Sequence, residues 1–449
     1  MSVSQNGVKK PSIALTIIGH VDHGKSTSMG RFLVDLGVID PRTFEKLQTE
    51  ASMLQMDSWA YAYILDSLPE ERERGLTSDI ALRPFETEKY RIMLIDAPGH
   101  RDFVKNMIRG AAQADACILF VSAAPSDLKA GVKVGDDQTP GGQTREHAIL
   151  ASVLGIEQII IAINKMDLVD YQKESYTKAV KTIIDLFKEI KSPWAYKLDN
   201  IPFIPISGLE GENLCAPSQK MPWWSGGSLL DSLNSLIPPS IRSEYSLRLV
   251  IQDTYEMPGV GVLLDGRVLS GRLGVNEKVL LLPINESGVI KDLWVDEDDI
   301  NITEAFAGDH VTLTVRGVEK ENLHSGIVLS DPNDPPSVPA KIVGRILLLD
   351  SGKMIIPGAL LALHCGTAQV SARINKILKI EHMSPKHKKV RREIEGRITF
   401  AFPGELIQLE IEPLESIVAE TYENHAALGR VVLRDMGVTV GVGIITHVE

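Results

Sequence analysis

Cysteines and long apolar runs are scarce in this sequence of 449 residues. The three cysteines, Cys117, Cys215 and Cys365, lie far apart and lack the paired spacing of a metal site, so we expect reduced and mostly buried thiols. No run approaches the roughly 18 apolar residues of a membrane-spanning helix, and residues 1–10 lack the apolar centre of a secretory signal. We therefore expect a cytoplasmic protein without membrane contact.

Basic charge is also in deficit. Lys and Arg total 47 against 59 Asp and Glu, which gives a net charge of -12. Because proteins that bind nucleic acid along much of their surface usually carry an excess of basic residues, any RNA contact must be confined to a local patch. The chain is too long for one compact core, and its length predicts about two to four domains.

The most informative stretch is a glycine-rich loop at residues 19–27, GHVDHGKST. It follows the apolar residues 13–18, expected as a buried parallel strand, and it precedes apolar residues with helical spacing. Such a loop aims its backbone N–H groups at a diphosphate, and the helix N-terminus adds partial positive charge. An ordinary glycine-rich turn is the alternative. The residues of this loop that we assign to the nucleotide are Asp22, His23, Gly24, Lys25, Ser26 and Thr27.

Two side chains of the loop and one further strand end predict a magnesium site. Lys25 would reach the outer phosphates, whereas the hydroxyl of Ser26 would ligate Mg²⁺, which prefers oxygen donors. Asp96 follows the apolar residues 92–95, at the carboxyl end of an expected parallel strand, where it would hold the metal through water. Gly99 would turn its N–H toward the terminal phosphate.

The strand expected at residues 159–163 leads into NKMD, residues 164–167. The Asp167 carboxylate would accept hydrogen bonds from the N1–H and 2-amino groups of guanine, which adenine does not offer in that arrangement. The Lys165 stem would cover the base, and Asn164 would tie this loop to the glycine-rich loop. A polar strand end is the alternative for the tetrapeptide alone. The strand expected at 203–206 ends in three residues whose backbone would contact the base: Ser207, Gly208 and Leu209.

Taken in order, these motifs resemble those of the translational GTPases, and among them those of archaeal and eukaryotic elongation factor 1-alpha. The resemblance reaches the C-terminus and so covers nearly the whole chain. The motifs that carry it lie at residues 19–27, 71–77, 96–103, 143–147, 164–167, 429–430 and 434–437.

The resemblance implies an α/β P-loop GTPase domain followed by two antiparallel β-barrel domains. We expect the GTP-binding domain at residues 1–238, the first barrel at 239–331 and the second at 332–449. Short apolar runs broken by glycine begin near residue 247 and are typical of a small barrel. The proline-rich residues 331–336 cannot lie inside a sheet and mark the second boundary.

The resemblance also implies how GTP would be hydrolysed to GDP and phosphate. The hydroxyl of Thr77 would complete the Mg²⁺ shell and be released after hydrolysis, and His100 would orient the attacking water. Val21 and Leu76 would form an apolar gate that keeps His100 from the water until the ribosome is engaged, although the family usually has Ile at the second position. Core packing is the alternative for both gate residues. A protein that holds GTP without hydrolysing it is the less favoured alternative.

Two cargoes remain open. The first is aminoacyl-tRNA, delivered to the ribosomal A site with hydrolysis on codon recognition; the second is a tRNA-mimicking release or rescue protein. Residues 221–224 and 248–253 look like archaeal elongation factor segments. His310 occupies a position where elongation factors typically have Asn and rescue GTPases can have His. The loop at 125–142 is longer than usual for elongation factors.

One basic cluster stands out in the last third of this acidic chain. It would hold an RNA backbone, although a solvated loop is the alternative. The resemblance implies the ribosome and the cargo as partners, and it allows a guanine nucleotide exchange factor as a third. We expect the protein to be a monomer. The cluster comprises Lys376, Lys379, Lys386, Lys388, Lys389, Arg391 and Arg392.

Overall fold

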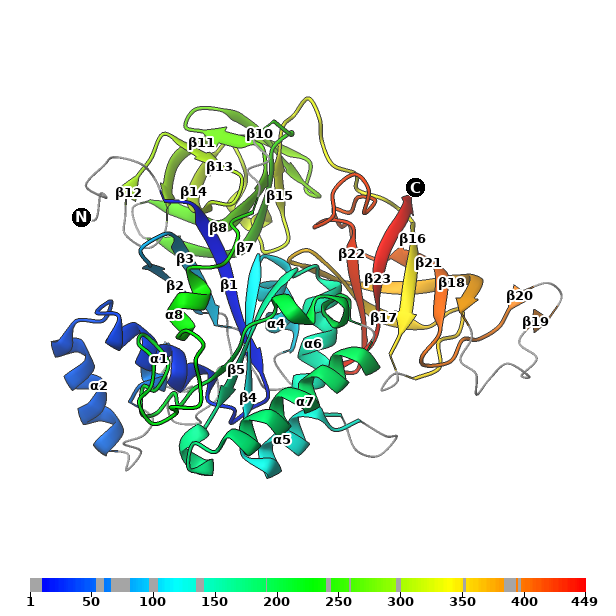
Figure 1. The fold of residues 1–449 in the computed structure, drawn as a ribbon. Helices are drawn as coiled ribbons and strands as arrows, with labels where there is room; N and C mark the ends of the chain where they lie inside the picture. The colour runs from blue at the N-terminus through cyan, green and yellow to red at the C-terminus, as the bar shows by residue number, and fades with distance from the viewer. Residues whose placement is uncertain are drawn as a thin grey trace. The chain divides into compact units, whose positions relative to one another are not determined.

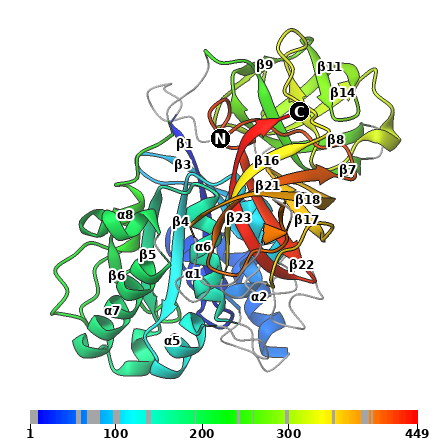
Figure 2. The same ribbon diagram turned by 90° about the vertical axis from the view of Figure 1, so that its right-hand side faces the viewer.

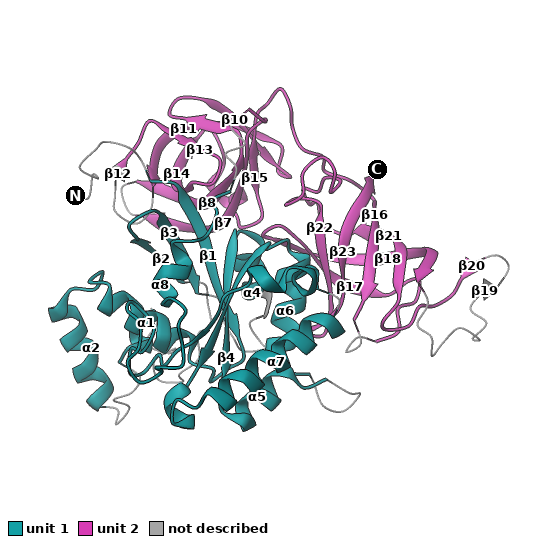
Figure 3. Ribbon diagram, viewed as in Figure 1, with its two compact units in different colours: residues 1–239 teal, residues 240–449 magenta. Residues whose placement is uncertain are grey.

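The chain forms two compact units, Met1–Pro239 and Ser240–Glu449 (Figure 3). The structure is a computed structural model. It describes residues 10–53, 60–65, 81–96, 104–134, 141–190, 192–239, 244–257, 260–295, 300–349, 353–382, 393–394 and 397–449. Among these residues no helix is long and apolar enough to cross a membrane.

A six-stranded sheet forms the centre of the first unit (Figure 1). Its strands follow the order β2-β3-β1-β4-β5-β6. All neighbouring strands are parallel except β2, which pairs antiparallel with β3 at one edge. The central strands are continuous apolar runs because helices cover both faces of such a sheet. The strands are β1 (Ser12–Gly19), β2 (Ala81–Glu86), β3 (Arg91–Asp96), β4 (Ala116–Ser122), β5 (Gln158–Asn164) and β6 (Phe203–Pro205).

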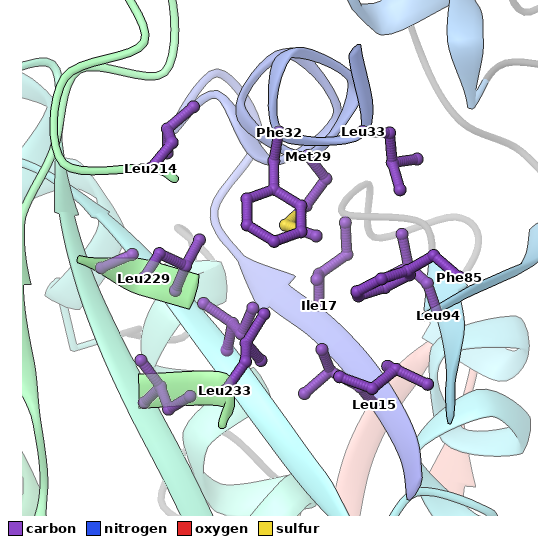
Figure 4. Packing of buried hydrophobic residues seen from close by; sticks show 14 of the residues in the cluster. Leu15, Ile17, Met29, Phe32, Leu33, Phe85, Leu94, Leu214, Leu229 and Leu233 are labelled. Carbon is purple, nitrogen blue, oxygen red and sulfur yellow. The ribbon is translucent and has the colours of Figure 1, made fainter. Parts of the chain in front are cut away.

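The helices of the first unit lie on both faces of this sheet. On one face, side chains of α1 and α8 pack on Leu15 and Ile17 of β1, with Phe32 of α1 at the centre (Figure 4). Helix α6 contacts β1 and β4. The helices are α1 (Lys25–Asp35), α2 (Pro41–Met53), α4 (Val104–Ala112), α5 (Pro125–Val132), α6 (Gln143–Val153), α7 (Lys173–Glu189) and α8 (Leu229–Leu233), with 3-10 turns η2 (Ala62–Ile64), η4 (Met166–Val169), η5 (Pro193–Tyr196) and η6 (Leu198–Asn200).

The second unit begins with an antiparallel barrel. Its strands follow the order β10-β15-β7-β8-β14-β11, and the barrel closes because β10 also pairs with β11. The elements are β7 (Arg248–Met257), β8 (Gly261–Ser270), β9 (Arg272–Gly274), β10 (Lys278–Leu282), β11 (Glu286–Val295), β12 (Ile300–Asn301), β13 (Glu304–Phe306), β14 (His310–Arg316), η7 (Lys320–Asn322) and β15 (Val328–Ser330).

A second antiparallel barrel follows in the order β17-β22-β23-β16-β21-β18, closed by the pairing of β17 with β18. Strands β16, β21, β18 and β17 lie alongside one another in Figure 2. The fold class expected from the sequence is thereby confirmed. The strands are β16 (Ile342–Leu348), β17 (Leu360–Cys365), β18 (Ala368–His382), β19 (Glu393–Ile394), β20 (Arg397–Ile398), β21 (Leu406–Pro413), β22 (Arg430–Asp435) and β23 (Val438–Val448).

Buried contacts join the two barrels into one compact unit. The Arg248 guanidinium, at the start of β7, lies 3.2 Å from a carboxylate oxygen of Glu420, and the side chains are 7% and 10% exposed. The Thr367 hydroxyl donates a 2.7 Å hydrogen bond to the carbonyl of Ile251. Both barrels thus fall within the second compact unit, and the expected boundary at residue 331 stays a prediction.

Arg248→Ala should lower the free energy of unfolding of the second unit by about 3–5 kcal/mol, since it leaves the buried Glu420 carboxylate without this ion pair. Denaturant unfolding followed by circular dichroism measures the change. Arg345→Ala is the matched control, because Arg345 is 49% exposed and pairs with Glu381 at the surface. That variant should cost less than about 1 kcal/mol. Equal losses in the two variants would contradict the prediction.

Candidate nucleotide-binding site

The glycine-rich loop connects the end of β1 to the start of α1. Gly24 has φ +77° at the N-cap of α1, and a Cβ there would lie 2.5 Å from the Asn164 amide nitrogen. Gly19 has φ +144°, and a Cβ there would lie 2.5 Å from the carbonyl oxygen of Phe120. Both positions therefore require glycine, because the backbone is left-handed and another segment approaches closely.

The Lys25 side chain folds back over this loop. Its ammonium donates hydrogen bonds to the carbonyls of Gly19 (3.3 Å) and His20 (3.1 Å), and the residue is buried. A cation and the N-terminus of an eleven-residue helix thus lie together at the loop. Of the other predicted loop residues, Asp22 is exposed, and Val21 and Thr27 are half-buried.

Ser26 and Asp96 come together from different elements. The Ser26 hydroxyl, in the first turn of α1, lies 3.4 Å from a carboxylate oxygen of Asp96, the last residue of β3. Asp96 is fully buried. A hydroxyl and a carboxylate are the hard oxygen donors that Mg²⁺ prefers, so this donor set fits the metal.

Asn164, at the end of β5, connects three segments of the site. Its amide nitrogen donates to the His23 carbonyl (2.8 Å) and to the Ser28 hydroxyl (3.0 Å). Its amide oxygen accepts a 2.9 Å hydrogen bond from the backbone N–H of Gly208. The glycine-rich loop, helix α1 and the loop after β6 therefore share one buried side chain.

The other residues that the sequence predicts to contact the base lie near Asn164. The Asp167 carboxylate accepts a 2.5 Å hydrogen bond from the Ser207 hydroxyl. Lys165 has a left-handed backbone, φ 62°, and its ammonium lies 3.0 Å from Asp127. The Leu209 carbonyl accepts a 3.0 Å hydrogen bond from Arg31 of α1.

Gln143 and His147 of α6 support the glycine-rich loop from the other side. The Gln143 side-chain oxygen accepts from the N–H of Val21 (2.9 Å), and His147 Nδ1 accepts from the N–H of Gly19 (3.1 Å). Burial, with the positive charge of Lys25 second, lowers the pKa of His147 to about 3. The ring is therefore neutral, and its Nδ1 lone pair can accept the hydrogen bond.

Sequence reasoning missed the contacts of several of these residues. The QTREH motif at 143–147 was part of the resemblance, but nothing local assigned Gln143 or His147 to the glycine-rich loop. Arg31 belongs to no motif, and Asp127 lies in the segment 125–142, which was expected to be a loop although residues 125–132 form helix α5. Their partners lie far away in the sequence, so only the folded chain brings them to the site.

Several predicted residues lie outside the described part of the chain: Leu76, Thr77, Gly99, His100, Lys386, Lys388, Lys389, Arg391 and Arg392. The described members of the basic cluster, Lys376 and Lys379, are exposed on β18. Lys376 pairs with Glu410 at 3.6 Å. His310, at the start of β14, is buried with its Nδ1 3.6 Å from Asp265.

Comparisons with known families agree with this architecture. Residues 10–239 match the model of the Elongation factor Tu GTP binding domain, and residues 341–446 match that of the GTP-eEF1A C-terminal domain-like family. The S. cerevisiae Ski7 GTPase-like domain bound to GTP aligns with a TM-score of 0.77 over 98% of both chains. At 18% identity this likeness concerns the fold alone.

Two curated relatives match along nearly the whole chain. Elongation factor 1-alpha of Ignicoccus hospitalis is 41% identical over 443 residues, which are 98% of this chain and 97% of that protein. The protein of the same name from Hyperthermus butylicus is 40% identical, again over 98% of this chain and 97% of its own length.

A P-loop domain that matches the GTP-binding family, followed by two β-barrels, defines a translational GTPase. With 41% identity over nearly its full length, the chain belongs to the elongation factor 1-alpha family. The expectations of guanine nucleotide binding, GTP hydrolysis and a role in translation elongation are thereby confirmed. The alternative of a release or rescue carrier gains no better support from these relatives.

The depressed histidine pKa values predict a loss of stability in acid. Burial lowers the pKa of His23 to about 4 and that of His147 to about 3, against an ordinary value of 6.5. Below pH 6.5 the unfolded chain binds protons that the folded chain does not, so stability falls as pH falls toward 4. Each histidine should lower the free energy of unfolding by about 2 kcal/mol at pH 5 relative to neutral pH.

The measurement for this pH prediction is denaturant unfolding of the wild type and of His147→Gln at pH 7.5 and pH 5. The variant should lose about 2 kcal/mol less than the wild type between these pH values, because glutamine does not titrate. Equal losses would show that His147 does not contribute to the acid sensitivity.

Asp167→Asn tests the proposed recognition of guanine. The amide can donate to the 2-oxo group of xanthine, whereas it cannot accept both hydrogen bonds from guanine. GDP affinity should fall by about tenfold or more and affinity for xanthosine diphosphate should rise, as measured by competition against a fluorescent nucleotide. Asp170→Asn, three residues further on, is the control. Unchanged preference for guanine in Asp167→Asn would remove this residue from base recognition.

Proposed function

We propose that the protein binds GTP with Mg²⁺, carries aminoacyl-tRNA to the ribosomal A site and hydrolyses GTP to GDP and phosphate on codon recognition. The observation that carries this proposal is the 41% identity to an elongation factor 1-alpha over 443 residues. That similarity includes both barrels as well as the GTPase domain. We further propose that the protein is monomeric and cytoplasmic. In this proposal the ribosome stimulates its GTP hydrolysis, and an exchange factor can replace its bound GDP with GTP.

The geometry supports the first step, which is retention of the nucleotide. Lys25 lies against the glycine-rich loop, where its ammonium would neutralise the outer phosphates. Ser26 and Asp96 would hold Mg²⁺, which supplies further charge neutralisation to the phosphates when bound. Asn164 keeps the base loop fixed against the phosphate loop, so that Asp167 would meet the guanine edge in a preorganised position.

Hydrolysis in this proposal needs residues that lie outside the described part of the chain. Thr77 would complete the metal shell, the Gly99 N–H would face the terminal phosphate, and His100 would orient the water. Val21 and Leu76 would keep His100 away from the attacking water until the protein engages the ribosome. These assignments follow from the match of the motifs to the family, and the described Val21 contributes its backbone N–H to Gln143.

A second cargo is favoured by one specific observation. His310 is buried beside Asp265 in the first barrel, where elongation factors typically have Asn. A carrier of a tRNA-mimicking release or rescue protein is therefore the second candidate.

Acidic partners on β21 partly neutralise the basic side chains of β18. Arg373 pairs with Glu412 (3.5 Å), and Lys376, a member of the basic cluster, pairs with Glu410 (3.6 Å).

Titration of the GTP-bound protein with fluorescent aminoacyl-tRNA distinguishes the two cargoes. Aminoacyl-tRNA should bind about tenfold or more tightly than the same tRNA without its amino acid, and the preference should disappear with GDP. Deacylated tRNA and the GDP complex are the controls. No preference for the charged tRNA would overturn the elongation proposal and favour the second candidate.

A further inference from the structure

Asp127 lies in the first turn of α5 and gathers polar contacts from around the base site. One carboxylate oxygen lies 3.0 Å from the Lys165 ammonium and accepts a 3.1 Å hydrogen bond from the Ser122 hydroxyl. The other oxygen accepts a 3.1 Å hydrogen bond from Ser126. Ser122 ends β4 and Lys165 follows β5, so the carboxylate bridges two neighbouring strand ends.

The backbone of Asp127 also touches the phosphate loop. Its carbonyl oxygen lies 3.2 Å from Nε2 of His23. One turn further along α5, a Cβ on Gly131 would lie 2.8 Å from the ring of His23. Helix α5 is therefore packed tightly against the glycine-rich loop, and Asp127 has little freedom to leave its position.

Asp127 keeps its charge in this environment. Burial by itself would raise the pKa of the Asp127 carboxyl, but the hydrogen bond and charge of Lys165, together with the two serine hydroxyls, outweigh it and lower the pKa. The side chains of Lys165 and Asp127 are 25% and 30% exposed, so the pair is only partly open to solvent. A carboxylate thus faces the lysine at neutral pH.

A partner for the Lys165 ammonium restricts a side chain that is otherwise flexible. Its backbone is held in the left-handed region, but its four-carbon side chain has several rotatable bonds. Fixing that chain costs conformational entropy, and a partner that fixes it before the nucleotide binds removes this cost from binding. Preorganisation of this kind acts mainly on the dissociation rate.

We propose that Asp127 is a positioning residue for guanine nucleotide retention, because its carboxylate holds the Lys165 ammonium and so keeps the lysine stem over the base. The inference rests on the guanine site proposed above and concerns a residue that belongs to none of the motifs. Asp127 thereby slows the release of GDP without contacting the nucleotide.

The test is the dissociation rate of fluorescent GDP, chased with excess GDP in a stopped-flow instrument. Asp127→Asn removes the charge but keeps the size and an oxygen that can accept from Ser122. Release should become about two- to fivefold faster. High salt should accelerate release from the wild type more than from the variant, because only the wild type has the ion pair.

Glu86→Gln is the matched control. Glu86 pairs with Lys10 at 2.8 Å, with side-chain exposures of 37% and 25%, near the amino end of the central strands rather than at the base site. The substitution Glu86→Gln removes the carboxylate charge from a similar lysine–carboxylate pair in the same unit. GDP release from this variant should equal that of the wild type.

A double-mutant cycle with Lys165→Gln separates positioning from a general structural role. If Asp127 acts through Lys165, Asp127→Asn should have little further effect in the Lys165→Gln background. The inference is overturned if Asp127→Asn releases GDP at the wild-type rate, or if its effect persists in full without Lys165. Failure of the wild type itself to bind GDP would instead overturn the guanine site on which the inference depends.

Discussion

The predicted nucleotide site depends on one buried amide, the side chain of Asn164. This side chain binds the carbonyl of His23, the hydroxyl of Ser28 and the N–H of Gly208. Because both ends of the amide are used, its orientation is fixed, and with it the spacing between the phosphate loop and the base loop. An amide at a strand end can make these bonds at once, whereas an apolar residue would leave buried polar groups without them.

The same close approach explains why two glycines are required around Asn164. A Cβ on Gly24 would lie 2.5 Å from the Asn164 amide, and one on Gly208 would lie 1.9 Å from the Ser28 hydroxyl. Neither position therefore has room for a side chain. His147 of α6 also contacts the phosphate loop, and burial keeps its ring neutral, so that Nδ1 accepts the backbone N–H of Gly19.

Much of the fold follows from local sequence. Continuous apolar runs predicted the buried parallel strands, since strands covered on both faces need no alternation. The glycine-rich loop between β1 and α1 was evident for a similar reason: its glycines, Lys25 and Ser26 are neighbours in the sequence. The roles of Thr77 and His100 could be taken only from the family resemblance, because nothing in their local sequence fixes what they contact.

The sequence by itself determined the fold class and the family of the chain, and it predicted the class of nucleotide that NKMD would bind, but it missed helix α5 in the segment 125–142 that was expected to be a loop. Only the tertiary structure decided that Gln143 and His147 support the phosphate loop and that Asp127 holds Lys165. It also joined the barrels through Arg248 and Glu420, which are 172 residues apart. Hydrogen bonds and ion pairs are short-range, so their partners are set by which strand ends and loops the fold places side by side, and residue spacing along the chain carries no such information.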